Sequence, residues 1–282
     1  MEPLHAGRCG DESPTVPAMT GAAVPLLDVE DVRVTFGGIV ALDGVSFSVQ
    51  RGAIAGLIGP NGAGKTTLFN CISRIYQADS GSIRVDGKPI FDSPIHGISK
   101  VGLGRTFQNL ALFGKLSVLD NVLIGAHART MGNFVSDALR LLGMRRRETA
   151  LRDEAMALLE ELRLDDIAGE TVAALPFGTQ KRVELARALS AKPTLLMLDE
   201  PAGGLNHDEV EEFKDVVRRI RDHRHISILL VEHHMNLVMS VSDQVVVLNF
   251  GRKIAEGTPT EVQSNPSVID AYLGSGHETE AH

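Results

Sequence analysis

The sequence predicts an α/β protein built on a mainly parallel sheet, with an N-terminal antiparallel β part and an inserted α-helical subdomain. The first observation is a set of short, continuous apolar runs at residues 54–58, 195–198, 226–231 and 245–248. Such runs are typical of strands that are covered on both faces, and helical patterns separate them along the chain. Buried strands that alternate with helices indicate a parallel sheet. The second observation is that no buried strand pattern occurs between residues 117 and 189.

The N-terminal part shows the alternation of half-buried strands. Apolar and polar residues alternate around residues 32–36 and again around residues 45–49, and Gly37-Gly38 provides a turn between them.

In the middle of the chain the period of the apolar residues changes to that of an amphipathic helix. Its apolar residues lie at spacings of four, three and four: Leu151, Ala155, Leu158 and Leu162.

These patterns divide the chain into four segments. We predict a mobile N-terminal tail over residues 1–25 and the first part of the core over residues 26–108. The helical subdomain then covers residues 109–190. The second part of the core and a C-terminal tail cover residues 191–282.

Composition excludes several classes of protein. The 282 residues carry 28 Lys+Arg and 36 Asp+Glu, a net charge of −8, and 43% of them are hydrophobic. The chain is therefore too apolar for a disordered protein, and its acidity argues against nucleic-acid binding by broad electrostatics. No apolar run approaches the length of a membrane span. Two cysteines, Cys9 and Cys71, cannot form a disulfide framework.

A phosphate-binding loop follows the first buried run. Residues 59–66 read Gly-Pro-Asn-Gly-Ala-Gly-Lys-Thr, which matches G-x-x-x-x-G-K-[ST]. Glycines let successive backbone N–H groups curl around phosphate oxygens, and the next helix, expected over residues 65–75, directs its positive end at the anion. Lys65 adds a charge and the Thr66 hydroxyl can ligate Mg²⁺. The predicted nucleotide-binding residues are Gly59, Pro60, Asn61, Gly62, Ala63, Gly64, Lys65, Thr66 and Thr67.

Two carboxylates follow the second buried run. Asp199 and Glu200 come at the carboxyl end of residues 195–198, where open α/β sheets place their ligands. Asp199 is expected to hold Mg²⁺, and Glu200 to polarise an attacking water. An adjacent Glu favours hydrolysis over phosphoryl transfer to a metabolite. Together with the phosphate loop, the pair predicts a P-loop NTPase core that uses a nucleoside triphosphate and Mg²⁺.

Further segments, in order along the chain, resemble the nucleotide-binding subunit of an ABC transporter over about residues 26–273. Residues 105–109, Arg-Thr-Phe-Gln-Asn, resemble its Q-loop, and residues 175–182, Leu-Pro-Phe-Gly-Thr-Gln-Lys-Arg, resemble its signature segment. Residues 203–206 resemble the D-loop, and residues 231–233 resemble the strand that carries the switch histidine. Phe36 falls where an aromatic side chain usually stacks on adenine.

The resemblance implies a composite ATP site. Two such subunits pair head to tail as a homo- or heterodimer, and the signature of one covers the phosphates held by the other. Gln108 would contact Mg²⁺ or water, and His233 would hydrogen-bond the γ-phosphate and orient the attacking water. The catalytic set is then Glu200, His233 and Gln108, and the metal set is Thr66, Gln108 and Asp199. The signature residues in trans are Leu175, Pro176, Phe177, Gly178 and Thr179.

The resemblance also implies partners and a place in the cell. The subunit would sit peripherally at the cytoplasmic face of the cell membrane and drive two transmembrane permease subunits. A solute-binding protein would act with it indirectly, and no nucleic acid is expected.

The signature departs from the family pattern Leu-Ser-Gly-Gly-Gln. Proline at position 176 offers neither a hydroxyl nor a backbone N–H, so the usual serine contact to the γ-phosphate is absent. Gly178 keeps its N–H, and the following helix still presents its positive end. We expect a working, altered contact in trans.

A narrower resemblance is to the branched-chain amino-acid importers. It rests on residues 36–42, 200–206, 249–257 and 265–274, and the same branch carries a similar variant signature. Importers of urea or short amides share much of this pattern and remain an alternative. A soluble ABC-type ATPase that acts on DNA or ribosomes usually has two cassettes or a long coiled coil, which this chain lacks. A catalytically silent regulatory module is disfavoured by the intact set of motif residues.

Overall fold

The structure is a computed structural model, and it describes most of the chain in four ranges: residues 24–91, 101–106, 111–130 and 141–274. Most of the predicted N-terminal tail, residues 1–23, lies outside the described residues, as does the candidate catalytic residue Gln108.

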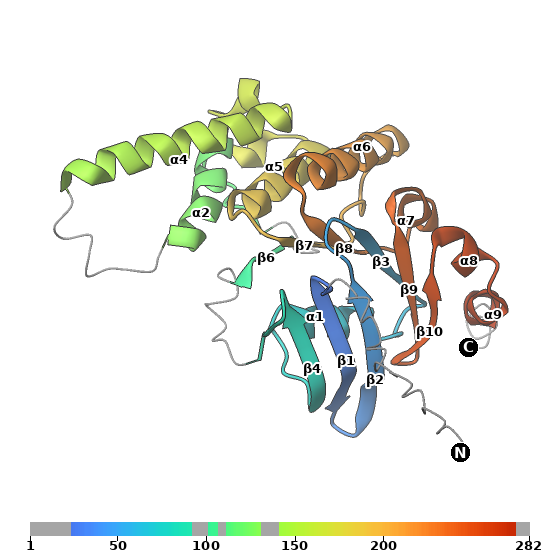
Figure 1. Cartoon of the computed structure of the whole chain (residues 1–282). Helices are drawn as coiled ribbons and strands as arrows, with labels where there is room; N and C mark the ends of the chain where they lie inside the picture. Colours follow the sequence, from blue (N-terminus) through green and yellow to red (C-terminus); the bar gives the residue numbers. More distant parts are fainter. Residues whose placement is uncertain (1–23, 92–100, 107–110, 131–140, 275–282) are drawn as a thin grey trace, which may run out of the picture.

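In the described part of the chain, the strands form two sheets (Figure 1). A four-stranded sheet has the order β2-β1-β4-β5, and a six-stranded sheet has the order β10-β9-β3-β8-β7-β6. The strands are β1 Leu27–Phe36, β2 Ile39–Val49, β3 Ile54–Ile58, β4 Ser80–Val85, β5 Lys88–Pro89, β6 Leu103–Arg105, β7 Leu195–Asp199, β8 Ser227–Val231, β9 Gln244–Asn249 and β10 Arg252–Gly257.

The four-stranded sheet is antiparallel and begins with the two strands that the alternation predicted. β1 and β2 form a hairpin, and both glycines of the connecting turn, Gly37 and Gly38, adopt positive φ (52° and 88°). β4 pairs with the other edge of β1 and was not predicted. Two of its six residues, Ile83 and Val85, are apolar, which is too short a pattern to recognise.

The six-stranded sheet contains all four buried runs. β9, β3, β8, β7 and β6 run parallel to one another, and the edge strand β10 pairs antiparallel with β9. β8 begins at Ser227 rather than at residue 226, because Ser227 is the first residue that pairs with β7, opposite Leu195. The predicted mainly parallel sheet is therefore confirmed. β6 and β10 were not predicted, since β6 has three residues and β10 is half exposed.

The parallel sheet lies between two hydrophobic cores because its strands are buried on both faces. In β3, Ile54 and Ile58 pack into a core formed with α2 and α4 to α9. Ala55 and Leu57 point the other way, into a core that contains α1 and the inner face of the antiparallel sheet. Helix α1 therefore lies between the two sheets, while the other helices cover the opposite face (Figure 1).

The helix after the phosphate loop ends earlier than predicted. It stops at Ile72 rather than at residue 75, because Arg74 adopts a left-handed conformation (φ 63°) that cannot continue a helix. The hydroxyl of Ser73 donates to the Phe69 carbonyl in the last turn.

The helices are α1 Lys65–Ile72, α2 Val118–Thr130, α4 Leu141–Glu161, η2 Asp165–Ile167, η3 Val172–Ala174, α5 Phe177–Ser190, α6 His207–Arg224, α7 Met235–Val241, α8 Pro259–Gln263 and α9 Pro266–Gly274.

Helices α2, α4 and α5 pack on one another at one end of the molecule (Figure 1). The apolar stripe predicted for the central helix is buried: Leu151, Ala155, Leu158 and Leu162. The boundaries 109–190 for this subdomain stay a prediction. Within the described ranges, no helix combines the length and hydropathy that a bilayer crossing requires.

The close contact between β3 and α7 leads to a stability prediction. A Cβ at Gly56 would lie 2.3 Å from Val238 Cγ1 and 2.9 Å from Ser242 Oγ. Overpacking of this kind costs about 1–3 kcal/mol, so Gly56→Ala should lower the free energy of unfolding by that amount in urea denaturation. Gly169→Ala is the matched control, because a Cβ there meets no atom within 4 Å. Equal stability of the two variants would contradict the packing described.

Candidate active site

The phosphate loop connects β3 to α1 and can be built only with glycine at two of its positions. A Cβ at Gly59 (φ 153°) would lie 2.2 Å from the Leu248 carbonyl oxygen. A Cβ at Gly64 (φ 99°) would lie 2.7 Å from the Ala41 carbonyl oxygen. The loop therefore sits directly against the end of β9 and the start of β2, where side chains would hold its backbone off.

The lysine of the phosphate loop, Lys65, bonds to the backbone of the same loop. Lys65 Nζ donates to the carbonyl oxygens of Gly59 (2.7 Å) and Pro60 (2.9 Å), and the side chain is buried. Burial lowers the pKa of the Lys65 ammonium, and the nearby Glu200 carboxylate opposes this shift. The N-cap of α1, Gly64, provides no side-chain hydrogen bond. A positive charge and an uncapped helix end thus meet in one loop, which is an arrangement that binds phosphate.

The remaining loop residues differ in exposure. Asn61, Gly62 and Thr66 are exposed, Ala63 is buried and Thr67 is half buried. The positions that would face a bound nucleotide are therefore open to solvent around the buried lysine.

Phe36 is the last residue of β1. Its hairpin partner strand β2 contributes Ala41, whose carbonyl approaches Gly64. The Phe36 ring is 46% exposed and meets the Tyr76 ring edge to face, with centroids 5.3 Å apart. Tyr76 follows α1 and was not predicted as part of the site. The two rings form an exposed aromatic pair at the end of the strand whose hairpin partner, β2, approaches the phosphate loop through Ala41.

Asp199 ends β7 and forms a buried ion pair. Arg105 Nη2, at the end of β6, lies 3.0 Å from Asp199 Oδ2, and the two side chains are 11% and 6% exposed. Burial raises the pKa of Asp199, and Arg105 lowers it in part. The guanidinium of Arg105 also donates to Asn70 Oδ1 and Ser73 Oγ of the α1 region. Arg105 therefore joins β7 to the helix that follows the phosphate loop.

The arginine contributes a further contact to that helix. Its guanidinium carbon lies 4.7 Å from the centre of the Phe69 ring of α1, a cation–π geometry. The sequence marks Arg105 only as part of the segment that resembles a Q-loop. A lone arginine on a three-residue strand carries no signal of this role, because Asp199 is 94 residues away.

Glu200 adopts a left-handed backbone conformation, with φ 45°. Non-glycine residues in this region are uncommon and store strain that the surrounding structure must hold. Here the Glu200 N–H donates to the Val231 carbonyl (2.9 Å), and the Glu200 carbonyl accepts from Gly203 N–H (3.1 Å). These two backbone hydrogen bonds hold the turn at Glu200 against the end of β8 and within its own loop.

His233 follows β8 and lies next to Glu200. Its Nδ1 is 3.9 Å from Glu200 Oε2, and the two side chains are 53% and 27% exposed. This distance is longer than a hydrogen bond, so the two side chains are neighbours but are not hydrogen-bonded to each other. Both are partly exposed to solvent. The structure therefore brings together the two residues predicted as base and switch histidine.

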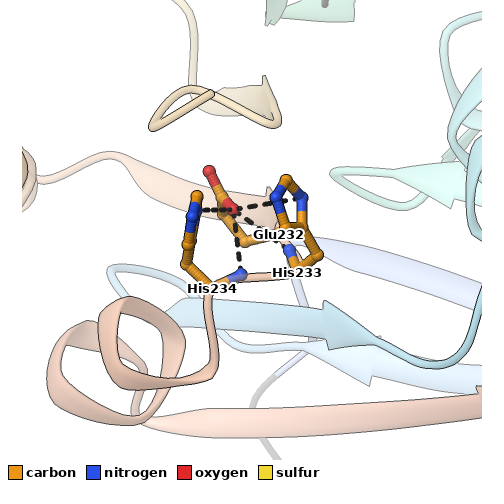
Figure 2. Close-up of side chains that lie close together, drawn as sticks. All are labelled: Glu232, His233 and His234. Atoms are coloured by element: carbon orange, nitrogen blue, oxygen red, sulfur yellow. Dashed lines mark hydrogen bonds and ion pairs between the residues drawn. The ribbon is translucent and has the colours of Figure 1, made fainter. Parts of the chain in front are cut away.

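Glu232 and His234 flank His233 and were not predicted as site residues. Figure 2 shows the Glu232 carboxylate between the two imidazole rings. His234 Nδ1 is 3.3 Å from Glu232 Oε2, and the two rings lie with centroids 4.3 Å apart. In a single sequence, an acidic residue between a strand and a histidine pair gives no sign of how deeply it is buried.

The signature segment lies at the start of α5, on the helical subdomain. Pro176 is the N-cap, without a side-chain hydrogen bond, and the helix begins at Phe177, which is 45% exposed. A Cβ at Gly204 would lie 2.8 Å from the Phe177 ring, so the D-loop packs against the signature of the same chain. A Cβ at Gly178 would meet Glu209 Oε1 at 2.3 Å. The role of residues 175–179 in trans stays a prediction.

Helix α6, which follows the D-loop segment, begins with a side-chain cap. Asn206 caps α6 in a reciprocal capping box with Glu209, at 2.8 and 3.0 Å.

The C-terminal helix also reaches the site. Burial raises the pKa of the Tyr272 hydroxyl in α9, and a hydrogen bond with the backbone of Gly59 opposes part of the shift. The C-terminal region therefore contacts the first residue of the phosphate loop. This contact was not predicted, because 213 residues of chain separate the two groups.

The chain is similar in sequence to families and proteins that are already known. Residues 42–203 match the family model described as ABC transporter, and residues 252–278 match that of the branched-chain amino acid ATP-binding cassette transporter. Among curated proteins, the chain is 42% identical over 250 residues to the high-affinity branched-chain amino acid transport ATP-binding protein BraF of Pseudomonas aeruginosa. It is 40% identical to LivG, a protein of the same description, from Salmonella typhimurium. Each alignment covers 89% of this chain and 98% of the relative.

Solved structures show the same architecture. An ATP-binding cassette of an ABC transporter in its ADP conformation superposes with a TM-score of 0.78 at 31% identity. That superposition covers 89% of this chain and 99% of the other. The predicted fold class is confirmed.

The Arg105–Asp199 pair predicts a pH-dependent loss of stability. In Arg105→Met the carboxylate stays buried without its partner, which costs about 3–5 kcal/mol. The loss of Arg105 also raises the Asp199 pKa further, so that folding favours the protonated carboxyl. A carboxyl with a raised pKa in the folded state stabilises the fold at low pH and loses that contribution as the pH rises. Urea denaturation in EDTA should therefore show a larger deficit at pH 8 than at pH 5.

The matched variant for this experiment is Arg105→Lys, which keeps the charge. It should show a smaller deficit and the pH dependence of the parent protein. A deficit of Arg105→Met that is equal at pH 5 and pH 8 would contradict the ion-pair account.

Proposed function

The chain belongs to the ABC transporter family of ATP-binding cassettes, and from this premise we propose that it is the ATP-hydrolysing subunit of an importer for branched-chain amino acids. The observation that carries the ATPase assignment is the meeting of Lys65, Glu200 and His233 at one end of the parallel sheet. The solute assignment is supported by the C-terminal match over residues 252–278 and by the descriptions of the relatives.

ATP binds with its adenine ring against Phe36 and its phosphates in the loop of residues 59–67. The loop supplies backbone N–H donors, and the positive end of α1 attracts the phosphates. Lys65 leaves the carbonyl oxygens of Gly59 and Pro60 to meet the β- and γ-phosphates. Its charge is available for this because the ammonium is already held at the carbonyl oxygens of the loop.

Hydrolysis uses the two groups that face each other across 3.9 Å. Glu200 accepts a proton from the attacking water. His233 hydrogen-bonds the γ-phosphate and orients that water. Both side chains remain partly exposed, so water and phosphate can reach them.

The side chains proposed to hold Mg²⁺ are of types that suit this cation. A hydroxyl, a carboxylate and a side-chain amide are hard ligands of the kind that this cation prefers. We assign Thr66, Asp199 and Gln108 to it. Arg105 bonds Oδ2 of Asp199 and leaves Oδ1 outside that bond. When bound, the ion neutralises charge on the β- and γ-phosphates of ATP.

The working unit contains a second cassette and membrane subunits. The signature segment, residues 175–179, covers the phosphates held by the second cassette in a head-to-tail dimer. The exposure of Phe177 and the positive end of α5 support this role, because both are open to a second cassette. Two permease subunits carry the solute across the membrane, a solute-binding protein delivers it, and the cassettes act from the cytoplasmic face.

Uptake in whole cells tests the proposal. Cells without this subunit should lose uptake of labelled leucine, isoleucine and valine and keep uptake of urea. The parental gene should restore amino-acid uptake, and the Lys65→Ala variant should not. Loss of a charged phosphate contact weakens ATP binding about tenfold or more.

Lys88→Ala is the matched control for the lysine variant, because Lys88 is exposed on β5. It should restore uptake fully. Unimpaired uptake of the three amino acids in cells lacking the subunit would refute the solute assignment. Loss of urea uptake instead would favour the related urea importers.

A further inference from the structure

Glu232 is a buried carboxylate at the end of β8 that the proposed mechanism does not use. Its side chain is fully buried, although the adjacent His233 and His234 are about half exposed. A buried carboxylate is costly unless hydrogen bonds compensate for its lost water. Among the contacts of the described residues, no lysine or arginine pairs with it. Its charge is held instead by backbone N–H groups.

The carboxylate of Glu232 bonds two loops at once. Oε1 accepts from the Ala202 N–H at 2.8 Å, in the loop that follows β7. Oε2 accepts from the N–H groups of His233 (3.0 Å) and His234 (3.2 Å), in the loop that follows β8 (Figure 2). Hydrogen bonds to a charged acceptor are about twice as strong as neutral ones. Glu232 is therefore a clamp between the segments that carry Glu200 and His233.

The Glu232 clamp holds the turn that contains the left-handed residue Glu200. The Glu200 N–H is held by the Val231 carbonyl, and two residues later the Ala202 N–H is held by Glu232. Both anchors belong to the end of β8, so the left-handed Glu200 is fixed from both sides. The same carboxylate fixes the backbone that carries the His233 ring.

The three side chains could also be considered as metal ligands, because their ligand atoms lie within 4.8 Å of one another. However, Oε2, the oxygen nearest to both rings, already accepts two backbone N–H bonds. The donors present therefore describe a hydrogen-bonded cluster rather than a metal site.

We propose that Glu232 is a positioning residue for ATP hydrolysis, which sets the geometry of Glu200 relative to His233 by clamping the two loops. The proposal rests on the ATPase function proposed above. The Glu232 side chain is fully buried and its oxygens accept backbone N–H groups, so its loss should affect the chemical step rather than the binding of ATP.

The Glu232→Gln variant tests this role in the full-length protein. An amide cannot accept on both sides, so one of the two loops faces an NH₂ group instead of an acceptor. We expect kcat for ATP hydrolysis to fall about ten- to one-hundred-fold. KM and the affinity for a non-hydrolysable ATP analogue should stay within about twofold, since the phosphate loop is untouched. Glu232→Asp, which keeps the charge, should have an intermediate kcat.

The matched control is Glu261→Gln. Glu261 also accepts a backbone N–H, that of Thr258 at 2.7 Å, but in the capping box of α8. It should leave kcat unchanged. If it lowers kcat as much as Glu232→Gln, the effect reflects general loss of stability and the proposal is wrong.

Further outcomes of this experiment distinguish failure of the positioning role from failure of the proposed function. An active parent with an unchanged kcat in Glu232→Gln overturns the positioning role alone. A rise in KM together with the fall in kcat, in both Glu232→Gln and Glu232→Asp, indicates a structural role only and overturns it as well. A parent protein that binds ATP without hydrolysing it refutes the proposed function itself. If Glu232→Gln does not fold, the kcat and analogue affinity of Glu232→Asp decide the matter by the same criteria.

Discussion

The register of three adjacent parallel strands is the constraint on which the site depends. Val231 at the end of β8 pairs with Leu57 of β3 on one side and with Asp199 of β7 on the other. The phosphate loop, the carboxylate pair and the histidine pair therefore leave the sheet at the same level. Because these strands are buried on both faces, a shift by one residue would turn apolar side chains from one core into the other. Core packing thus fixes the register, and the register positions the chemistry.

Three charged side chains are buried at this edge of the parallel sheet, and each is stabilised by a different kind of partner. The Lys65 ammonium is held by carbonyl oxygens of its own loop, and the Asp199 carboxylate by Arg105. Glu232 is held by backbone N–H groups of two loops. Each arrangement compensates for lost hydration. Each also links elements that must be aligned for hydrolysis: β3 with α1, β6 with β7 and α1, and the loop after β7 with the loop after β8.

Strands and site residues could be predicted from the sequence where the signal is local. Contacts that depend on residues far apart in the chain could not. The phosphate loop and the Asp199-Glu200 pair follow apolar runs directly, so motif and strand reinforce each other. The short strands β4 and β6 lack enough apolar residues to show a period. The contact of Arg105 with Asp199 joins residues 94 positions apart, and Ala202 and Glu232 are 30 apart. Such pairs form only after the strands have been ordered in the sheet. Gln108 lies outside the described residues, so its role stays a prediction.

The central claim is that Glu200 is the base of an ATP site that is completed by a second cassette. The most direct measurement compares the parent with Glu200→Gln after incubation with ATP and Mg²⁺, followed by size-exclusion chromatography and quantification of bound nucleotide. The account predicts that the variant elutes as a dimer retaining unhydrolysed ATP, while the parent releases ADP and dissociates. Hydrolysis of ATP by Glu200→Gln at the parental rate would contradict it.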